Sequence, residues 1–391
     1  MPRLNIVRDN LKVVDLFSGA GGFSLGAHLA GFRTVLATDV DTDLTKNYKS
    51  NFPQARYRTA DLSLVEPQGL LKVIDAKPGY VDGVLGGPPC QGFSSIGMRD
   101  PNDPRSELVR RFFHFVRHID PAFFVMENVR GILNDPFRKM LTDCISEAIG
   151  RYQIIGPIVL EASDFGAATS RPRVFIIGCR RSRMDPISER DIRRAIVKRR
   201  TTVYEAIHDL PRIRHAERKP DGDYWGRYVR EPDKGPGGEY ARRARRSPPN
   251  GLAAPYVRDL HRAGKVSGFQ PTNHSRAVLR RFEKLRCGDS DETSKCPRLD
   301  WEGICSTLRA GTGKDRGSYQ SIRPIHPTEN RVITVREAAR LQGFPDWFQF
   351  HPTKWHSFRM IGNSVSPYLV CRLLGLLARR LAVSGTRDIA S

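Results

Sequence analysis

The sequence predicts an α/β fold with a mostly parallel sheet, to which a smaller basic region is added. Short apolar runs alternate with helix-like segments through the first 180 residues, which is typical of parallel strands joined by crossover helices. From about Arg181 to Gly317 this alternation gives way to clusters rich in Gly, Pro and Arg. Regular structure returns at Val335–Leu341 and in a closing helix, Pro367–Leu381.

The first region holds six apolar runs with the length and residue types of buried strands. They are Lys12–Phe17, Thr34–Asp39, Asp82–Leu85, Phe123–Glu127, Ile154–Leu160 and Val174–Gly178. Between them, Ser106–Ile119 and Pro136–Ile149 are expected to form helices. Ligands bind at the carboxyl ends of the strands in folds of this class. We therefore expect the functional residues to flank these runs at one edge of the sheet.

Charge is unevenly distributed along the chain. The 391 residues carry a net charge of +22, with an isoelectric point near 10.1. Residues 181–330 hold 33 Lys and Arg against 20 Asp and Glu, so the middle of the chain is more basic per residue than the rest. Such an excess indicates a polyanionic partner such as nucleic acid. The alternative is an arginine-rich surface that is simply solvated.

Several classes of protein are not expected. The sequence has no run of about 18 apolar residues, and residues 1–17 lack the apolar core of a signal peptide, so we expect a cytoplasmic protein. The seven cysteines are scattered and odd in number, which does not predict a disulfide framework. No CxxC pair occurs, and the spacing of Cys287, Cys296 and Cys305 does not match zinc ligands, so no metal is expected.

The turn after the first strand is rich in glycine. The stretch DLFSGAGGFSLGAHLAG begins at Asp15, and glycines at such a turn allow a ligand to approach the backbone. It does not match the dinucleotide pattern G-x-G-x-x-G, because Ser24 stands sixth from Gly19. Asp39 ends the second strand and Asp61 follows the next strand-like run, where they can bind ribose hydroxyls and an adenine amino group. These features predict S-adenosylmethionine, an adenosine cofactor without a pyrophosphate.

The stretch GGPPCQGFS presents Cys90 directly after the third predicted strand. Pro89 fixes its own φ and restricts Pro88 to extended geometry, while the glycines on both sides permit close contacts. This pattern predicts a rigidly presented thiol. A reactive cysteine also needs a positioned partner, and Glu127 in MENV is expected at the same edge of the sheet.

A thiol, a carboxyl group and a guanidinium at one edge indicate conjugate addition to a pyrimidine. C5 of cytosine is a poor nucleophile until a thiolate adds to C6 and turns the ring into an enamine. Glu127, protonated or sharing a proton with N3, would assist that addition. Arg171 and Arg173 flank the last predicted strand, and an arginine near O2 would hold the base and stabilise developing charge. A methyl group could then be transferred to C5.

These motifs resemble, in order, those of bacterial-type DNA (cytosine-5) methyltransferases. The resemblance covers Val13 to about Phe175 and Thr307 to about Ala378. The matching stretches are DLFSGAGG, GGPPCQGFS, ENV, SRPRVFIIG, RVITVREAARLQGFPDWF and IGNSVSP. The family implies an S-adenosylmethionine-dependent methyltransferase (Rossmann-like) domain with a mostly parallel sheet, plus a smaller basic target-recognition domain.

The resemblance implies roles for individual residues. The implied catalytic residues are Cys90, Glu127, Arg173 and Arg171. The implied cofactor-binding residues are Phe17, Ser18, Gly19, Gly21, Gly22, Asp39, Asp61, Pro88, Asn363 and Ser364. The implied substrate-binding residues are Gln91, Ser94, Asn128 and Val129.

Among the catalytic residues, Cys90 would be the nucleophile, Glu127 the partner of N3 and Arg173 the contact of O2, supported by Arg171. Gln91 would help to fill the space that a flipped base leaves behind. The chain departs from the family pattern at two positions. Glutamine and an aromatic residue are usual where this chain has Thr169 and Val40.

A cytosine stacked in a duplex cannot be attacked at C6, so the base has to be flipped out. We expect residues 1–184 to form a catalytic and cofactor-binding domain, residues 185–306 a target-recognition region, and residues 307–391 a return to the catalytic domain. Arginines of the basic region would mostly neutralise phosphates, and fewer side chains would read base edges. The arginines expected to neutralise phosphates include Arg242, Arg243, Arg245 and Arg246.

The expected partner is double-stranded DNA. The protein would act as a monomer in the cytoplasm, associated with the nucleoid when on DNA, either beside a cognate restriction endonuclease or as a solitary methylase. Two alternatives stay open. One is the same chemistry on RNA, as in one eukaryotic branch that resembles this family, although that branch has a shorter recognition region. The other is a DNA-binding relic without catalysis, against which the intact Cys90, Glu127 and Arg173 argue.

Overall fold

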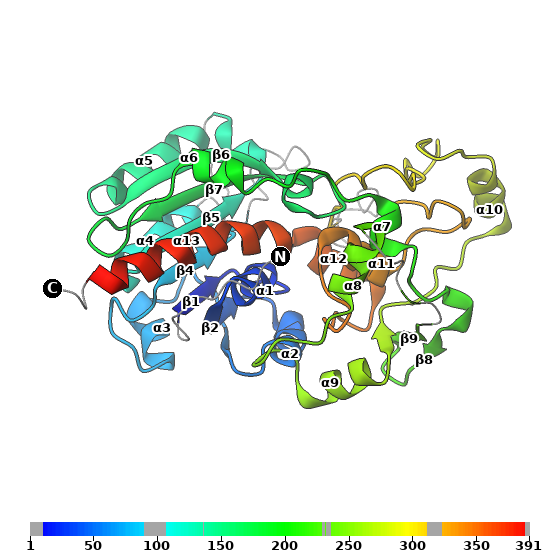
Figure 1. Ribbon diagram of the computed structural model, residues 1–391, viewed down its shortest axis with the longest axis horizontal. Helices are drawn as coiled ribbons and strands as arrows, with labels where there is room; N and C mark the ends of the chain where they lie inside the picture. Colours follow the sequence, from blue (N-terminus) through cyan, green and yellow to red (C-terminus); the bar gives the residue numbers. More distant parts are fainter. Residues whose placement is uncertain are drawn as a thin grey trace.

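The computed structural model describes residues 11–89, 107–135, 137–228, 231, 236–310 and 323–387. Figure 1 shows a larger part built on a layered sheet and a smaller part of short helices and strands beside it. The C-terminal helix starts next to the smaller part and runs along the larger one (Figure 1).

The larger part contains a seven-stranded sheet in the order β3-β2-β1-β4-β5-β7-β6. Its strands are β1 (Leu11–Leu16), β2 (Phe32–Asp39), β3 (Arg56–Thr59), β4 (Gly83–Gly86), β5 (Phe123–Asn128), β6 (Gln153–Glu161) and β7 (Pro172–Cys179). The first five strands pair in parallel, whereas β7 is antiparallel to both β5 and β6. The predicted α/β fold with a mostly parallel sheet is therefore confirmed.

Thirteen α-helices lie within the described residues. They are α1 (Gly22–Leu29), α2 (Thr42–Asn51), α3 (Pro67–Val73), α4 (Glu107–Ile119), α5 (Phe137–Ile149), α6 (Glu189–Arg194), α7 (Val203–Ile207), α8 (Glu239–Ala244), α9 (Pro255–Arg262), α10 (Arg276–Glu283), α11 (Val335–Gln342), α12 (Lys354–Asn363) and α13 (Pro367–Arg387).

Helices cover both faces of the sheet because its central strands are apolar on both sides. The β5 sequence FFVMEN is buried at every position. On one face, α1 and α13 pack against the sheet through residues such as Phe23 and Leu373. On the other face, α3, α4 and α5 contribute Leu70, Phe112 and Leu141 to a second cluster. The loops at the strand ends therefore start from rigid positions.

The segment Lys354–Val383 is long and apolar enough to cross a membrane by length and composition alone. Its most apolar window is 83% buried inside the protein. That burial is what the core helix of a folded domain requires, and it explains the apolar face of α13.

The smaller part holds a three-stranded antiparallel sheet of β8 (Glu217–Arg218), β9 (Tyr224–Arg227) and β10 (Lys265–Ser267). Its largest hydrophobic cluster unites α7, α8 and α9 with α11 and α12. Tyr48 and Phe52 of the α2 region belong to the same cluster. The segment that follows the basic region thus packs with that region as well as with the large sheet.

Candidate active site

Strands β1, β2, β4, β5 and β7 bring their flanking residues to one edge of the sheet. The first four are parallel and therefore end at the same edge. Because β7 is antiparallel to β5, its beginning lies where β5 ends: Glu127 pairs with Phe175, and Asn128 with Val174. The antiparallel direction, which the sequence analysis did not predict, brings the arginines near the start of β7 to this edge.

Glu127 and Arg173 form an ion pair there. Nε of Arg173 lies 3.0 Å from Oε1 of Glu127, and the two side chains are only 15% and 11% exposed. Burial raises the pKa of Glu127, and the positive charges of Arg173 and Arg171 partly oppose that rise. A Cβ atom on Gly87 would lie 3.0 Å from Oε2 of Glu127. The backbone that leads toward the predicted nucleophile therefore passes directly beside this carboxyl group.

Three predicted site residues lie outside the described residues: Cys90, Gln91 and Ser94. The chain just before them is tied to β5. The carbonyl oxygen of the buried Pro88 accepts a hydrogen bond from Nδ2 of Asn128 at 3.2 Å, and Oδ1 of Asn128 accepts one from the N–H of Val129 at 2.9 Å. Asn128 is 2% exposed, so its amide group positions the loop that precedes Cys90.

Arg171 is buried and faces the interior of the protein. Its Nη1 donates to the carbonyl oxygen of Leu308 at 3.1 Å, and its Nη2 donates to that of Gly362 at 2.6 Å. Next to it, the hydroxyl of Thr169 donates to the carbonyl oxygen of Ser306 at 3.2 Å. These bonds fasten the start of β7 to two later segments of the chain. Arg171 therefore fixes the backbone next to Arg173.

The glycine-rich turn after β1 folds over the end of β2. Phe17 has a φ of 58° and Gly21 a φ of 91°, in the left-handed region. A Cβ atom on Gly21 would overlap the ring of Phe52, so the turn also needs a residue without a side chain here. The N–H of Gly19 donates to Oδ2 of Asp39 at 2.8 Å, which connects the turn to the second strand.

Asp39 and Asp61 follow neighbouring strands. Asp39 is paired in register with Thr59, the last residue of β3, and Asp61 comes two residues later. Burial raises the pKa of Asp39. Asp61 is exposed, and hydrogen bonds from Ser63 lower its pKa. Asp39 already accepts hydrogen bonds from Gly19 and Asp41, but a carboxylate has further acceptor sites for ribose hydroxyls.

The last predicted motif packs on the glycine-rich turn. A Cβ atom on Gly22 would overlap Oγ of Ser364 and lie 2.5 Å from the carbonyl oxygen of Val365. Nε2 of Gln342 donates to the carbonyl oxygen of Ser364 at 2.8 Å, which holds the junction of α12 and α13 in place. Asn363, the last residue of α12, is exposed beside it.

The residues of this region fit S-adenosylmethionine. Oγ of Ser18 is buried and has no hydrogen-bond partner among the described residues. A Cβ atom on Gly19 would meet nothing within 4 Å, so the turn is open on that side. Val40, next to Asp39, is an apolar side chain that is 64% exposed. Over the ranges that the structure describes, no group of three or more His, Cys, Asp or Glu residues could hold a metal ion.

The sequence analysis missed a buried polar group beneath the turn. Oδ2 of Asp15 accepts hydrogen bonds from the N–H and the hydroxyl of Ser24, at 3.1 and 2.5 Å, and this hydroxyl lies 2.5 Å from the phenol oxygen of Tyr48. Burial raises the pKa of Asp15 to about 7. The group anchors the first turn of α1 below the candidate cofactor site. An acid inside the apolar run VVDLF was the signal available in the sequence.

Two of the four arginines predicted to neutralise phosphates are used inside the protein. Arg245 lies 2.7 Å from the carboxylate of Asp209. Arg243 lies 4.1 Å from the ring centre of Tyr368, as a cation–π contact. For these two residues the prediction is wrong, because their guanidinium groups contact side chains of the protein. The sequence could not show these contacts, since the partners are distant along the chain. The other two are exposed: Arg242 and Arg246.

Comparison with known proteins agrees with this arrangement. The sequence pattern of the family "C-5 cytosine-specific DNA methylase" matches residues 11–378. The type II methyltransferase M.XorII of Xanthomonas oryzae pv. oryzae is 39% identical over 373 residues, which cover 94% of this chain and 84% of that protein. M.DdeI of Desulfomicrobium norvegicum is 33% identical, with coverage of 92% and 86%.

Solved structures show the same fold. An E. coli protein described as a DNA modification methyltransferase encoded within a prophage superposes with a TM-score of 0.82 at 37% identity, over 95% of this chain and 99% of that one. The Dnmt2 methyltransferase of S. pombe shares the fold with a TM-score of 0.60 at 18% identity, over 95% and 99% of the two chains. The chain belongs to the C-5 cytosine-specific DNA methylase family.

Proposed function

We propose that this chain methylates C5 of a flipped cytosine in one specific sequence of double-stranded DNA. The observation that carries the proposal is the buried pair of Glu127 and Arg173 beside Gly87. It places a carboxyl group with a raised pKa and a guanidinium next to the backbone that leads to Cys90. Family membership supports both DNA as substrate and S-adenosylmethionine as cofactor.

In this proposal the thiolate of Cys90 forms a bond to C6 while Glu127 gives or shares a proton at N3. Arg173 holds O2 and stabilises the charge that develops on the ring. S-adenosylmethionine, when bound, supplies the methyl group that C5 takes. A base then removes the proton from C5, and cleavage of the bond between sulfur and C6 releases Cys90 and the product.

The other predicted residues support this chemistry from around the site. Asp39 and Asp61 would bind the adenosine, and Asn363 would close the cofactor site. We assign residues 1–184 to catalysis and cofactor binding, 185–306 to target recognition, and 307–391 to the return to the catalytic domain. The excess of Lys and Arg in the middle of the chain supports the second assignment.

The relatives support a proposal for the biological setting. The curated relatives named above are type II methyltransferases, so we assign this chain to a restriction-modification system, with a cognate endonuclease that cuts the same site. One catalytic edge and one recognition region support a monomer on DNA. Chromosomal DNA as the substrate places the enzyme in the bacterial cytoplasm, at the nucleoid.

Trapping with DNA that contains 5-fluorocytosine tests the role of Cys90. Fluorine stands in place of the C5 proton and cannot be removed by a base, so the bond between sulfur and C6 is not cleaved. The wild-type protein should therefore form a covalent complex that survives denaturing electrophoresis. The C90A variant should form none. The matched control is C287A, because Cys287 is an exposed free thiol outside the site, and it should form the complex normally. A complex that persists in C90A would contradict the assignment of the nucleophile.

A further inference from the structure

Helix α10 is a separate element at the far end of the smaller part (Figure 1). A small hydrophobic cluster of its own holds it in place, formed by Phe282 with Cys296, Ile325 and Val332. Nη2 of Arg298 donates to the carbonyl oxygen of Phe282 at the end of the helix and to Oδ1 of Asn330, at 2.5 and 2.7 Å. The helix is therefore fixed against the segment that carries Asn330, and its other side is exposed.

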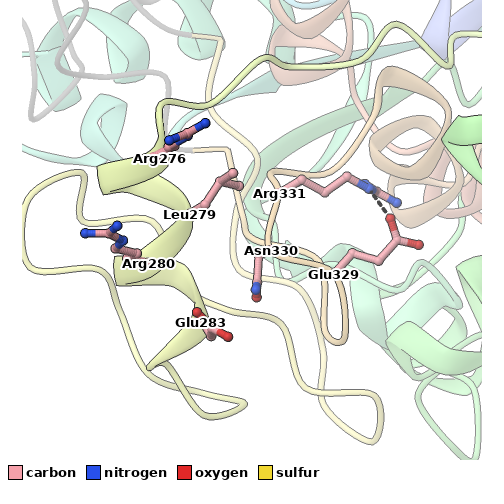
Figure 2. Close-up of a pocket in the computed structure, with 7 residues that line it drawn as sticks. All are labelled: Arg276, Leu279, Arg280, Glu283, Glu329, Asn330 and Arg331. Carbon is pink, nitrogen blue, oxygen red and sulfur yellow. Dashed lines mark hydrogen bonds and ion pairs between the residues drawn. The ribbon is translucent and has the colours of Figure 1, made fainter.

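A hollow of about 550 Å³ lies between α10 and this segment. It is lined by Arg276, Leu279, Arg280, Glu283, Glu329, Asn330 and Arg331. Figure 2 shows Leu279 pointing from α10 toward the segment that carries Asn330 and Arg331. Because Oδ1 of Asn330 already accepts a hydrogen bond from Arg298, its amide NH2 group is the part left to act as a donor.

Three charged residues on α10 have no ion-pair partner within the described ranges: Arg276, Arg280 and Glu283. Two neighbouring arginines, in contrast, form ion pairs within the protein. Nε of Arg281 lies 2.9 Å from Asp291, and Arg331 is paired with Glu329 and Glu337. One face of α10 is thus left with charges for an external partner.

We infer that this face of α10 reads a G·C base pair of the target sequence in the major groove. Arg280 donates to O6 and N7 of guanine, and Glu283, one turn further along, accepts from the N4 amino group of cytosine. An α-helix with its side chains is about 10–12 Å across, which suits a major groove about 12 Å wide. The inference deepens the proposed function and rests on it.

The mixture of side chains favours base reading over contact with the DNA backbone alone. A surface that binds only phosphates binds more tightly when it carries cationic side chains alone. The unpaired carboxylate of Glu283 would repel the phosphates. An acceptor three residues from a donor matches the edges of a G·C pair, where guanine accepts and cytosine donates. Leu279, directly before Arg280, is 39% exposed and adds an apolar contact of the kind that the methyl group of a neighbouring thymine fills.

The test is to map the methylated sequence of the wild type and then of R280A and E283Q. Purified protein is incubated with S-adenosylmethionine and a plasmid library, and 5-methylcytosine is located by sequencing. We expect R280A to lose discrimination at one G·C pair and to methylate the wild-type site on the order of 10- to 100-fold more slowly. E283Q should weaken the preference for the same G·C pair. R262A, an exposed helical arginine of the same region, should keep the wild-type preference.

The outcomes separate this inference from the function on which it rests. If the wild type methylates DNA but R280A and E283Q keep its site preference, α10 does not read bases and the proposed function stands. Equal weakening on every sequence, with a smaller dependence on salt, would mean a phosphate contact and would also overturn the inference. If the wild type transfers no methyl group to DNA, the proposed function itself fails. Thermal unfolding of each variant shows that lost preference does not come from lost folding.

Discussion

Glu127 is a carboxyl group that the fold removes from water and then sets beside a guanidinium. Burial raises its pKa while Arg173, 3.0 Å away, opposes the rise. In the proposed mechanism a raised pKa favours the protonated carboxyl group that would give its proton to N3. The sequence could predict this pair as residues at one edge, but not their contact, because the direction of β7 decides it.

At the residue scale we predict that E127Q lowers kcat by on the order of 100- to 10,000-fold while DNA binding is largely kept. The amide cannot donate the proton that N3 needs. The wild-type kcat should fall as pH rises through the raised pKa of Glu127, because the protonated form is then lost, and E127Q should lack that dependence. Methylation kinetics from pH 5 to 9 and gel-shift titration measure both. Unchanged turnover in E127Q would remove Glu127 from the mechanism.

The elements of the site are joined by close packing at a glycine and by side-chain hydrogen bonds to backbone carbonyl oxygens. The turn before α1 meets the junction of α12 and α13 at Gly22 and Ser364. The start of β7 is fastened to Leu308 and Gly362 through Arg171. The glycine-rich turn and the IGNSVSP motif were both visible in the sequence, but their contact was not, because 342 positions separate Gly22 from Ser364.

At the element scale we predict that G22A weakens binding of S-adenosylmethionine. The new Cβ would overlap Oγ of Ser364 and crowd the carbonyl oxygen of Val365, and overpacking of this kind costs about 1–3 kcal/mol. Denaturant unfolding should show this loss, and calorimetric titration should show weaker binding of S-adenosylmethionine because the turn has shifted. G150A is the matched control, because a Cβ on Gly150 meets nothing within 4 Å. Equal affinities for G22A and G150A would contradict this account of the turn.

At the scale of the whole molecule, buried arginines of α11 hold the segment after the basic region to that region. Arg340 is fully buried, with Nη1 3.0 Å from Asp209 and Nε 2.5 Å from Asp346. Arg336 donates to Ser267 of β10 and to the carbonyl oxygen of Phe348. The helix itself was predictable from VREAARLQ, but arginines in an amphipathic helix usually face water. Their carboxylate and carbonyl partners could not be read from the sequence.

At this scale we predict that R340M destabilises the protein by about 3–5 kcal/mol. Methionine keeps much of the apolar volume but leaves Asp346 buried without its cation, and Asp209 with Arg245 alone. Denaturant unfolding measures the change. R262A removes an exposed pair with Asp259 and should cost no more than about 1 kcal/mol. Similar losses in both variants would mean that Arg340 does not hold these two segments together.

The most direct test of the central claim is methyl transfer itself. Purified protein is incubated with S-adenosylmethionine carrying a labelled methyl group and with either duplex DNA or tRNA, and the product is sequenced for 5-methylcytosine. The account predicts label at C5 of cytosine in one DNA sequence and none in tRNA. Absence of transfer to DNA, or transfer to tRNA alone, would contradict it.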